Sequence, residues 1–528
     1  MMNKFWMMIL MIGVCLTARA GLDASLVHAL AAGDSDEKIQ AIQGLSANPS
    51  PLTLSVLKAL SEDALFVNGD QVFFRQSGQP VDAITGAPLA AVPDNPDNVV
   101  INNRVRTELD NLLAGMRLVD PDVTVRRAAA QALLDAPSVD MLPILTRAIA
   151  LESDVAIRSL LLQAQARLQL DNPDAQVRRA AVTVLADSIS ANTRSQLQSM
   201  TDPAHEPDEA VRHAALASLK SVNNRLAFTD VLAKLFSGIS LGSILMLTAL
   251  GLAITYGVMG VINMAHGELL MVVAYATYAT QGWFRLHWPQ HQQSYLLAAL
   301  PVAFASAALI GMVLERTVIR WLYGRPLETL LATWGLSLGL IQCARLLFGA
   351  QNVELANPDW MSGAVALPWG LSLPWNRIDI IVFSLLVLAL VWVLMNRTRL
   401  GLFVRAVTQN RPMAGCLGVP TGRVDTFAFG LGAGIAGLGG VALSQLTNVG
   451  PDMGQGYIVD SFMVVVLGGV GQLAGAVWAA LGLGIVSKLL EGWTGAVIAK
   501  IIVLVFIIVF IQRRPQGLFA LKGRTLDN

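Results

Sequence analysis

The residues best suited to handle a polar solute are Asn263, His266 and Glu268, which stand in otherwise apolar sequence. Polar side chains are costly in such surroundings unless they face a pathway or a partner. Asn263 and His266 are three residues apart, so on a helix they share a face. One interpretation has these side chains lining or gating a route. The other makes the segment a tight turn between two helices, with Asn263 capping a helix and Gly267 permitting the bend.

Catalytic and cofactor sites are disfavoured by the spacing of the remaining motifs. His266 and Glu268 lack the second histidine of an H-E-x-x-H zinc site. The glycine run from Gly432 to Gly440 has no strand before it, so close helix packing is favoured over dinucleotide binding. No G-x-x-x-x-G-K-[ST] loop occurs, so another chain would have to hydrolyse ATP in any pump. We therefore expect no catalytic residue, no metal and no cofactor.

Three further polar residues stand near the ends of apolar stretches. Gln445 and Asn448 follow Ser444 after the glycine run. They can meet an arriving polar solute or hydrogen-bond a neighbouring helix. Lys500 stands near the start of the last apolar stretch, where it either snorkels outward or pairs with Glu491.

The composition differs between the first and second parts of the chain and indicates a different surrounding solvent for each. Of the 528 residues, 54% are hydrophobic and 14% are charged, which argues against disorder and against an ordinary soluble enzyme. Before residue 228 the chain carries 19 basic and 25 acidic residues, and after it 18 and 12. We expect water around the first part and the lipid bilayer around the second. No basic cluster is dense enough to bind nucleic acid.

Nine apolar stretches in the second part are candidates for crossing a bilayer. They are 238–258, 262–281, 296–314, 327–348, 378–395, 424–447, 458–471, 474–490 and 495–511. The connections 315–325, 396–423 and 512–528 hold twelve basic residues, against two in 282–295, 349–377 and 448–457, so the first group is predicted to be cytoplasmic. An exported N-terminal part with a cytoplasmic C-terminus requires an odd number of crossings, so the short stretch 458–471 has to cross too.

The N-terminal residues 1–20 are predicted to be a secretory signal peptide. Lys4 is followed by an apolar run and then by Ala18-Arg19-Ala20. We expect cleavage after Ala20 and export of residues 21–228, and an uncleaved anchor helix is the alternative. The exported part has no cysteine and so needs no disulfide.

Residues 21–228 are predicted to form a helical repeat array outside the membrane. Three segments align, namely DPDVTVRRAAAQALL from Asp120, NPDAQVRRAAVTVLA from Asn172 and EPDEAVRHAALASLK from Glu206. Two further segments look like degenerate copies of this motif, ESDVAIRSLLLQAQ from Glu152 and DSDEKIQAIQGL from Asp34. Each has a proline and an aspartate that favour a helix start, followed by the apolar spacing of an amphipathic helix. The pattern resembles HEAT-like repeats, which stack into an α-solenoid that binds partners.

Two features interrupt or decorate this array. Asn68-Gly69 stands between two β-prone runs, which predicts a small β-hairpin within an insertion at 63–105. The pairs Arg126-Arg127 and Arg178-Arg179 either form an anion-binding row or bond the aspartates and carbonyls of neighbouring repeats.

Three long motifs in the apolar part carry a family resemblance. They are GVMGVINMAHGELLM within 238–278, RAVTQNRPMAGCLGVPTGRVDTFAFGLGAGIAGLGGVAL from Arg405, and VVLGGVGQLAGAVWAALGLGI from Val465. Through them, residues 230–522 resemble the membrane subunits of ABC importers for branched-chain amino acids, amides and urea. The resemblance implies that 229–528 is an all-α, polytopic permease domain of about nine spans in the bacterial inner membrane.

The same resemblance implies partners and a coupling loop. The partners are a second related permease, two cytoplasmic ABC ATPases and a periplasmic substrate-binding protein. The loop 405–423 would dock on an ATPase through an Ala-x-x-x-Gly element, matched by Ala414 and Gly418, with Arg405 and Arg411 in the same loop. The glutamate that opens the related element of other ABC importers is absent.

An exported repeat domain ahead of the permease resembles the urea branch of this family, so the expected cargo is urea. A branched-chain amino acid or a short-chain amide is the alternative. Urea is neutral and needs hydrogen-bonding groups along its route, which is compatible with Asn263, Gln445 and Asn448. The competing class is a membrane-anchored scaffold or receptor that acts through the solenoid, but nine spans are more than an anchor requires.

Overall fold

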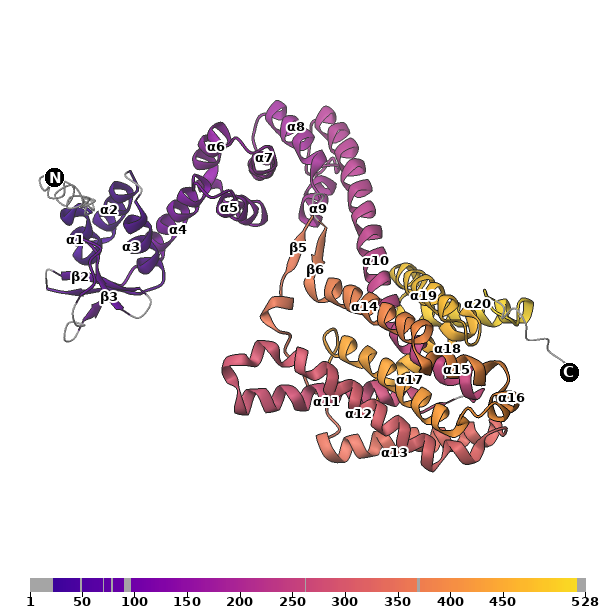
Figure 1. Cartoon of the computed structure of the whole chain (residues 1–528). Helices are drawn as coiled ribbons and strands as arrows, with labels where there is room; N and C mark the ends of the chain where they lie inside the picture. The colour runs from indigo at the N-terminus through magenta and orange to yellow at the C-terminus, as the bar shows by residue number, and fades with distance from the viewer. Residues whose placement is uncertain are drawn as a thin grey trace, which may run out of the picture. The chain divides into compact units, whose positions relative to one another are not determined.

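The computed structural model describes residues 22–519, apart from 48–49, 70, 77–78, 90–95, 262 and 368–370. The predicted signal peptide at 1–20 lies outside the described residues. The chain forms two compact units, Met1–Leu226 and Ala227–Asn528, whose elements are labelled in Figure 1. Each unit is described by itself.

Short helices make up most of the first unit. They are α1 (Ala24–Ala32), α2 (Ser35–Ala47), α3 (Pro51–Ser61), α4 (Asn103–Leu118), α5 (Val123–Asp135), α6 (Leu142–Leu151), α7 (Val155–Gln169), α8 (Ala175–Val184) and α9 (Ala191–Ser199), with the 3-10 turns η1 (Val139–Met141) and η2 (Leu185–Asp187). Asp122, Asp154 and Asp174 start α5, α7 and α8, because each carboxylate accepts the backbone N–H two residues further on. The aspartate of each motif is thus a helix cap.

A small antiparallel sheet lies between α3 and α4 in the sequence. Its strands are β1 (Leu65–Asn68), β2 (Gln71–Gln76), β3 (Gln79–Asp82) and β4 (Asp97–Asn98), in the order β3-β2-β1-β4. β1 and β2 pair as a hairpin that closes at Asn68 and Gln71, and Gly69 supplies the positive φ of 59° that the turn needs. Val72 and Phe73 are fully buried. The sheet contacts α1 and α3 and so belongs to this unit's core.

Two arginines join neighbouring motifs of the first unit through forked hydrogen bonds. Nε and Nη2 of Arg126 donate to the Glu152 carboxylate at 2.8 and 3.3 Å, and those of Arg178 donate to Glu206 at 2.7 Å each. Nη1 of each arginine donates to two carbonyl oxygens at the start of its own motif. The glutamate side chains are 2% and 1% exposed. These two arginines therefore bond neighbouring motifs and do not form an anion-binding row.

The forked pairs make the stability of this unit depend on pH. The pKa of the Glu206 carboxyl lies below its ordinary 4.5, chiefly because Arg178 donates hydrogen bonds to it. A carboxyl whose pKa is lowered by folding stabilises the fold above its unfolded pKa, and this contribution is lost as the pH falls through the folded pKa. The Arg178–Glu206 pair therefore stabilises the unit at neutral pH and fails in acid.

We expect Glu206→Gln to lower the free energy of unfolding of the first unit by about 3 kcal/mol at neutral pH, because Arg178 is left as an unpaired buried charge. The difference from the wild-type protein should shrink as the pH falls below about 4.5. Hydrogen exchange of residues 172–206 under increasing urea measures both effects. The exposed pair Lys58–Glu62 is the control, since Glu62→Gln should cost less than about 1 kcal/mol. An equal loss of unfolding free energy in Glu206→Gln and Glu62→Gln would contradict the stabilising role of the Arg178–Glu206 pair.

The second unit is built from long helices. They are α10 (Glu209–Met259), which begins in the first unit, α11 (His266–His287), α12 (Tyr295–Thr317), α13 (Pro326–Phe348), α14 (Trp375–Arg397), α15 (Arg399–Gln409), α16 (Arg411–Cys416), α17 (Thr421–Ser444), α18 (Met453–Gly468), α19 (Leu473–Thr494) and α20 (Ala496–Arg513). Connections hold η3 (Pro289–Ser294), η4 (Ile319–Leu322), η5 (Asp359–Met361) and the two-stranded hairpin β5 (Ala364–Ala366) and β6 (Ser372–Pro374).

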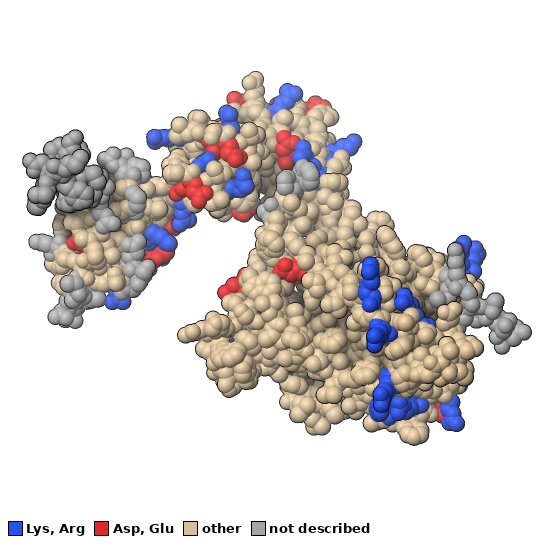
Figure 2. All heavy atoms as spheres, in the orientation of Figure 1, with Lys and Arg blue, Asp and Glu red and all other residues tan. Residues whose placement is uncertain are grey.

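Among the described residues, seven helices are long and apolar enough to cross a membrane, those that contain α10, α12, α13, α14, α17, α19 and α20. The predicted stretches 262–281 and 458–471 fall on α11 and α18, and α18 has only 16 residues. Nine crossings therefore remain a prediction that needs both of these helices to cross. Figure 2 shows a face of this unit that is almost free of charge, with basic side chains gathered toward the end where Figure 1 places α15 and α16.

The glycine run lies in α17, which packs on α11 and α12. A Cβ built on Gly440 would overlap the carbonyl oxygen of Leu270 in α11, and one on Gly432 would lie 2.6 Å from the carbonyl oxygen of Gly251 in α10. No larger residue fits these backbone contacts. The run therefore serves close helix packing, as its sequence context predicts.

Candidate functional site

The chain breaks its helix between α10 and α11. Residues 260, 261 and 263–265 carry no helix, and Gly260 has a positive φ of 67°, so the bend occurs there and Gly267 lies within α11. Asn263 accepts a hydrogen bond from the backbone N–H of Ala265 at 3.0 Å, which stabilises the turn that leads into His266. Asn263 and His266 are 2% and 1% exposed. The segment is therefore a turn that begins at the exposed Gly260 and leads to the buried side chains of Asn263 and His266.

The polar residues after the break bond to the middle of neighbouring helices. His266 Nε2 lies 3.2 Å from the Thr248 carbonyl oxygen of α10. Glu268 Oε1 accepts a hydrogen bond from Ser337 Oγ at 2.9 Å, and Ser337 is the central residue of α13. Upstream, Met264 donates its backbone N–H to Thr333 Oγ1 at 3.1 Å. We name this arrangement the polar junction: Asn263, His266, Glu268, Thr248, Thr333, Ser337 and Ser461.

Helix α18 closes the polar junction from another side. Its Ser461 Oγ lies 2.6 Å from Thr248 Oγ1, on the residue whose carbonyl meets His266. Near its start, Gly454 touches the backbone of Gly267, and a Cβ on Gly454 would stand 2.9 Å from Glu268 Oε2. Sequence reasoning missed Thr248, Ser337 and Ser461. Their only signal is a small hydroxyl side chain within an apolar stretch, which many spanning helices contain.

Three buried atoms of the polar junction have no hydrogen-bond partner among the described residues. They are Asn263 Nδ2, His266 Nδ1 and Glu268 Oε2. A carbonyl oxygen can only accept, so Nε2 of a neutral His266 carries the proton toward Thr248 and Nδ1 is left as an acceptor. The junction thus offers one amide donor and two acceptors. Each unpaired group costs about 1–3 kcal/mol, so these three atoms need polar partners that the described residues do not supply.

The structure does not bring Gln445 and Asn448 into this junction. Gln445 is 4% exposed, accepts a hydrogen bond from Tyr295 at 3.3 Å and donates one to Ser444 at 3.2 Å. Asn448 is exposed, in the connection after α17. No hydrogen bond between described residues links either side chain to Asn263, His266 or Glu268.

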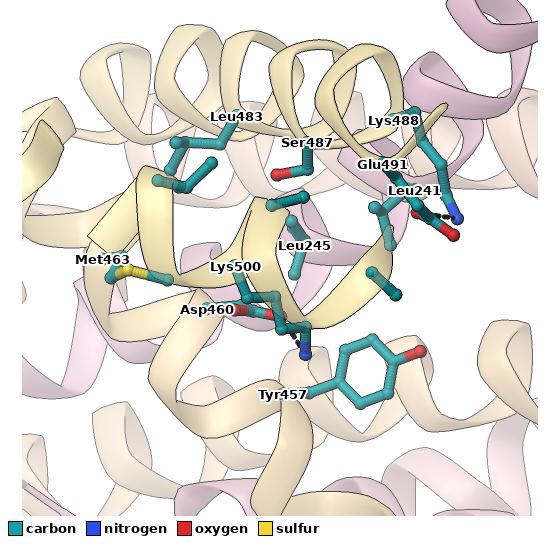
Figure 3. Close-up of a pocket in the computed structure, with 13 residues that line it drawn as sticks. Leu241, Leu245, Tyr457, Asp460, Met463, Leu483, Ser487, Lys488, Glu491 and Lys500 are labelled. Atoms are coloured by element: carbon teal, nitrogen blue, oxygen red, sulfur yellow. Dashed lines mark hydrogen bonds and ion pairs between the residues drawn. The ribbon is translucent and has the colours of Figure 1, made fainter. Parts of the chain in front are cut away.

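A separate cavity of about 230 Å³ lies among α10, α18, α19 and α20. Figure 3 shows Lys500 reaching toward Asp460, and their charged atoms are 3.4 Å apart. Glu491 pairs with Lys488 at 2.7 Å. Pairing of Lys500 with Glu491, one of the two sequence alternatives, is therefore wrong. The carboxylate partner of Lys500 comes from α18 and lowers the cost of an ammonium group near the membrane.

The predicted coupling loop forms two helices, α15 and α16. Arg405 donates to the side chain of Asn396 at 3.3 Å. Arg411 pairs with Asp425 of α17, and its guanidinium lies 4.9 Å from the ring centroid of Tyr323. The Asp425 side chain is 1% exposed. Arg411 therefore anchors α16 to α17.

A second buried carboxylate reinforces this anchor. Glu315 of α12 is fully buried and accepts hydrogen bonds from Tyr323 at 3.1 Å and from Thr426 at 2.6 Å. Arg320 Nε lies 3.8 Å from the same carboxylate. Sequence reasoning missed Glu315, Asp425 and Tyr323, because it weighed only the arginines of these connections.

The outward face of α16 is apolar. Met413 and Leu417 are 57% and 78% exposed. Ala414 is only 3% exposed, so its side chain packs inward. Gly418 has a positive φ of 82° and open space around it. The surface available to a partner is therefore centred on Met413, Leu417 and Gly418.

We expect Gly454→Ala to destabilise the second unit by about 1–3 kcal/mol, because the new Cβ would overlap the carbonyl oxygen of Gly267. Gly456→Ala is a matched control on the same helix, with nothing within 4 Å of its Cβ. It should leave stability unchanged or raise it by up to about 1 kcal/mol. Thermal unfolding of both purified variants in detergent gives the comparison. Unchanged thermal stability in Gly454→Ala would show that α11 and α18 do not pack as closely as the structure has them.

Residues 234–511, a little over half of the chain, match the family described as branched-chain amino acid transport system / permease component. The chain is 27% identical over 296 residues to the high-affinity branched-chain amino acid transport system permease protein LivH of Salmonella typhimurium, which covers 55% of this chain and 96% of LivH. LivH of Escherichia coli gives the same identity and coverage.

A third relative is the permease protein BraD of Pseudomonas aeruginosa, at 27% identity over 293 residues, which covers 54% of this chain and 95% of BraD. The family match begins at residue 234, after the last of the three aligned motifs. No solved structure matches the chain.

Proposed function

Because this chain belongs to the branched-chain amino acid transport system / permease component family, we propose that it is the permease subunit of an ATP-driven ABC importer for urea. The permease domain would comprise 229–528 and cross the bacterial inner membrane nine times. It would work with a second related permease, two cytoplasmic ABC ATPases and a periplasmic substrate-binding protein. Hydrolysis of ATP would belong to the ATPases.

The observation that carries the choice of urea is the set of unpaired atoms in the polar junction. Urea has one carbonyl acceptor and two amino groups that donate. Asn263 Nδ2 is a free donor, and His266 Nδ1 and Glu268 Oε2 are free acceptors. The numbers and types of these groups complement a single urea molecule. A neutral solute also leaves no charge to be compensated inside the membrane.

A branched-chain amino acid is the second candidate, favoured by the names of the relatives. Its ammonium group could meet Glu268, but its carboxylate needs a cation or several donors. Asn263 Nδ2 is the one unpaired donor among the described side chains of the junction. A short-chain amide keeps the carbonyl and one amino group, so it would use part of the same set.

The first unit would act outside the membrane. In this proposal 1–20 is a signal peptide, 21–228 is a periplasmic HEAT-like repeat domain with the insertion 63–105, and the C-terminus is cytoplasmic. The basic connections support this orientation, because α15 and α16 carry several of the arginines. ATP binding would then press an ATPase against the face of Met413 and Leu417. Arg411 and Asp425 would pass that force to α17.

The solute is tested with the complete importer in proteoliposomes. We expect ATP-dependent uptake of labelled urea, with little uptake of leucine. Asn263→Asp keeps the shape but replaces the donor by an acceptor, so kcat/KM for urea should fall about tenfold or more. Asn352→Asp, at an exposed asparagine after α13, is the control and should change little. Uptake of leucine without urea would overturn the choice of solute but keep the family.

The coupling surface is tested with Leu417→Asp, which places a charge on the exposed apolar face of α16. We expect normal insertion in the membrane but at least tenfold less uptake, because loss of a central apolar contact weakens docking by about 2 kcal/mol. Leu417→Met keeps the face apolar and should retain uptake. Gly418→Trp is a less clean variant, since the positive φ strains any larger residue. Full uptake by Leu417→Asp would show that the ATPase docks elsewhere.

A further inference from the structure

The three aligned motifs share one arginine geometry. In each, Nη1 of the arginine donates to the two carbonyl oxygens that open its own motif. The distances are 2.8 and 3.1 Å for Arg126, 2.8 and 2.9 Å for Arg178, and 2.9 and 2.8 Å for Arg212. The other two donors of each guanidinium, Nε and Nη2, are then left to bind a carboxylate through two parallel hydrogen bonds. We call this pair of donors the fork of the arginine.

The forks of the first two motifs are filled, and that of the last is open. Glu152 fills the fork of Arg126, and Glu206 fills the fork of Arg178. Each glutamate also accepts the backbone N–H two residues further on, at the start of the next motif helix. Arg212 is partly buried, and no carboxylate forms an ion pair with it among the described residues.

An apolar position four residues after each arginine shows the same difference between the motifs. Ala130 and Val182 are fully buried, whereas Leu216 is 52% exposed. Ala130 packs in a cluster with residues of α7, and Val182 packs in a cluster with residues of α10. The following motif helix thus covers both the arginine fork and the apolar position. For Arg212 and Leu216 no following motif exists in the described chain.

We propose that this open repeat face, Arg212 and Leu216 of α10, docks a helix of the importer's own substrate-binding protein that begins with a carboxylate. The proposal rests on the proposed function, which puts this unit outside the membrane, on the side where the periplasmic substrate-binding protein works. The chemistry comes from the filled motifs: a carboxylate enters the fork of Arg212, and an apolar helix face covers Leu216. The first part of the chain carries 19 basic and 25 acidic residues, so its net charge does not attract a carboxylate and the attraction has to come from the Arg212 guanidinium itself.

The test uses the full chain in its complete importer and the purified binding protein, with affinity measured by biolayer interferometry. Arg212→Glu should weaken binding at least tenfold, and Arg212→Lys should weaken it less, because lysine keeps the charge but loses the fork. Leu216→Ser should also weaken binding. His213→Glu, one position along on an exposed side chain, changes the charge but leaves the fork and should bind as the wild-type protein does.

The outcomes separate this proposal from the proposed function. With saturating binding protein, urea uptake by Arg212→Glu should return to the wild-type rate, since the polar junction is untouched. Unchanged affinity in both Arg212→Glu and Leu216→Ser would overturn the docking face while leaving urea transport intact. Light scattering addresses a second copy of this chain as the occupant. A self-association of the wild-type protein that Arg212→Glu abolishes would also overturn the assignment to the binding protein.

Discussion

A chain that crosses a bilayer has to satisfy its backbone hydrogen bonds within the protein, and this constraint shapes the break between α10 and α11. The backbone N–H of Gly260 donates to Tyr256, and that of Ala265 donates to the side chain of Asn263. Met264 donates to Thr333. The polar side chains around the break are therefore needed to keep non-helical backbone inside an apolar unit. Three of their atoms, Asn263 Nδ2, His266 Nδ1 and Glu268 Oε2, have no hydrogen-bond partner among the described residues.

Close backbone contact holds this break in place. Gly440 of α17 faces Leu270 near the start of α11, and Gly267 of α11 faces Gly454 of α18. Glycine is required at these contacts because a Cβ would overlap a backbone atom. The same helix α17 carries Asp425, which receives Arg411 from α16. Helix α17 therefore contacts both α16 and α11, the helix that starts at the polar junction, so it physically connects the two.

The long helices of the second unit and part of the polar junction could be predicted from local sequence. Apolar stretches indicate the long helices, and Asn263, His266 and Glu268 stand out because their surroundings are apolar. Interactions between residues far apart in sequence could not be predicted. Examples are the ion pair of Lys500 with Asp460 and the hydrogen bond that Glu268 accepts from Ser337. The inward face of Ala414 also escaped prediction, because spacing within a six-residue helix does not say which side meets the core. Helix faces are set by tertiary packing, which one sequence does not record.

Ion pairs between an arginine and a buried carboxylate play different parts in the two units. In the second unit, Arg411 and Asp425 join two helices of one compact body, where an unpaired charge would be costly. In the first unit, each arginine of the filled motifs receives a glutamate that the next motif supplies, so the pair both adds a layer and sets its register. Such an array has no internal reason to stop, because its last arginine is as well preset as the earlier ones. At the end of the described motifs, a carboxylate beside an apolar helix face is the chemistry that would repeat at Arg212 and Leu216 what Glu206 and α10 supply to Arg178 and Val182.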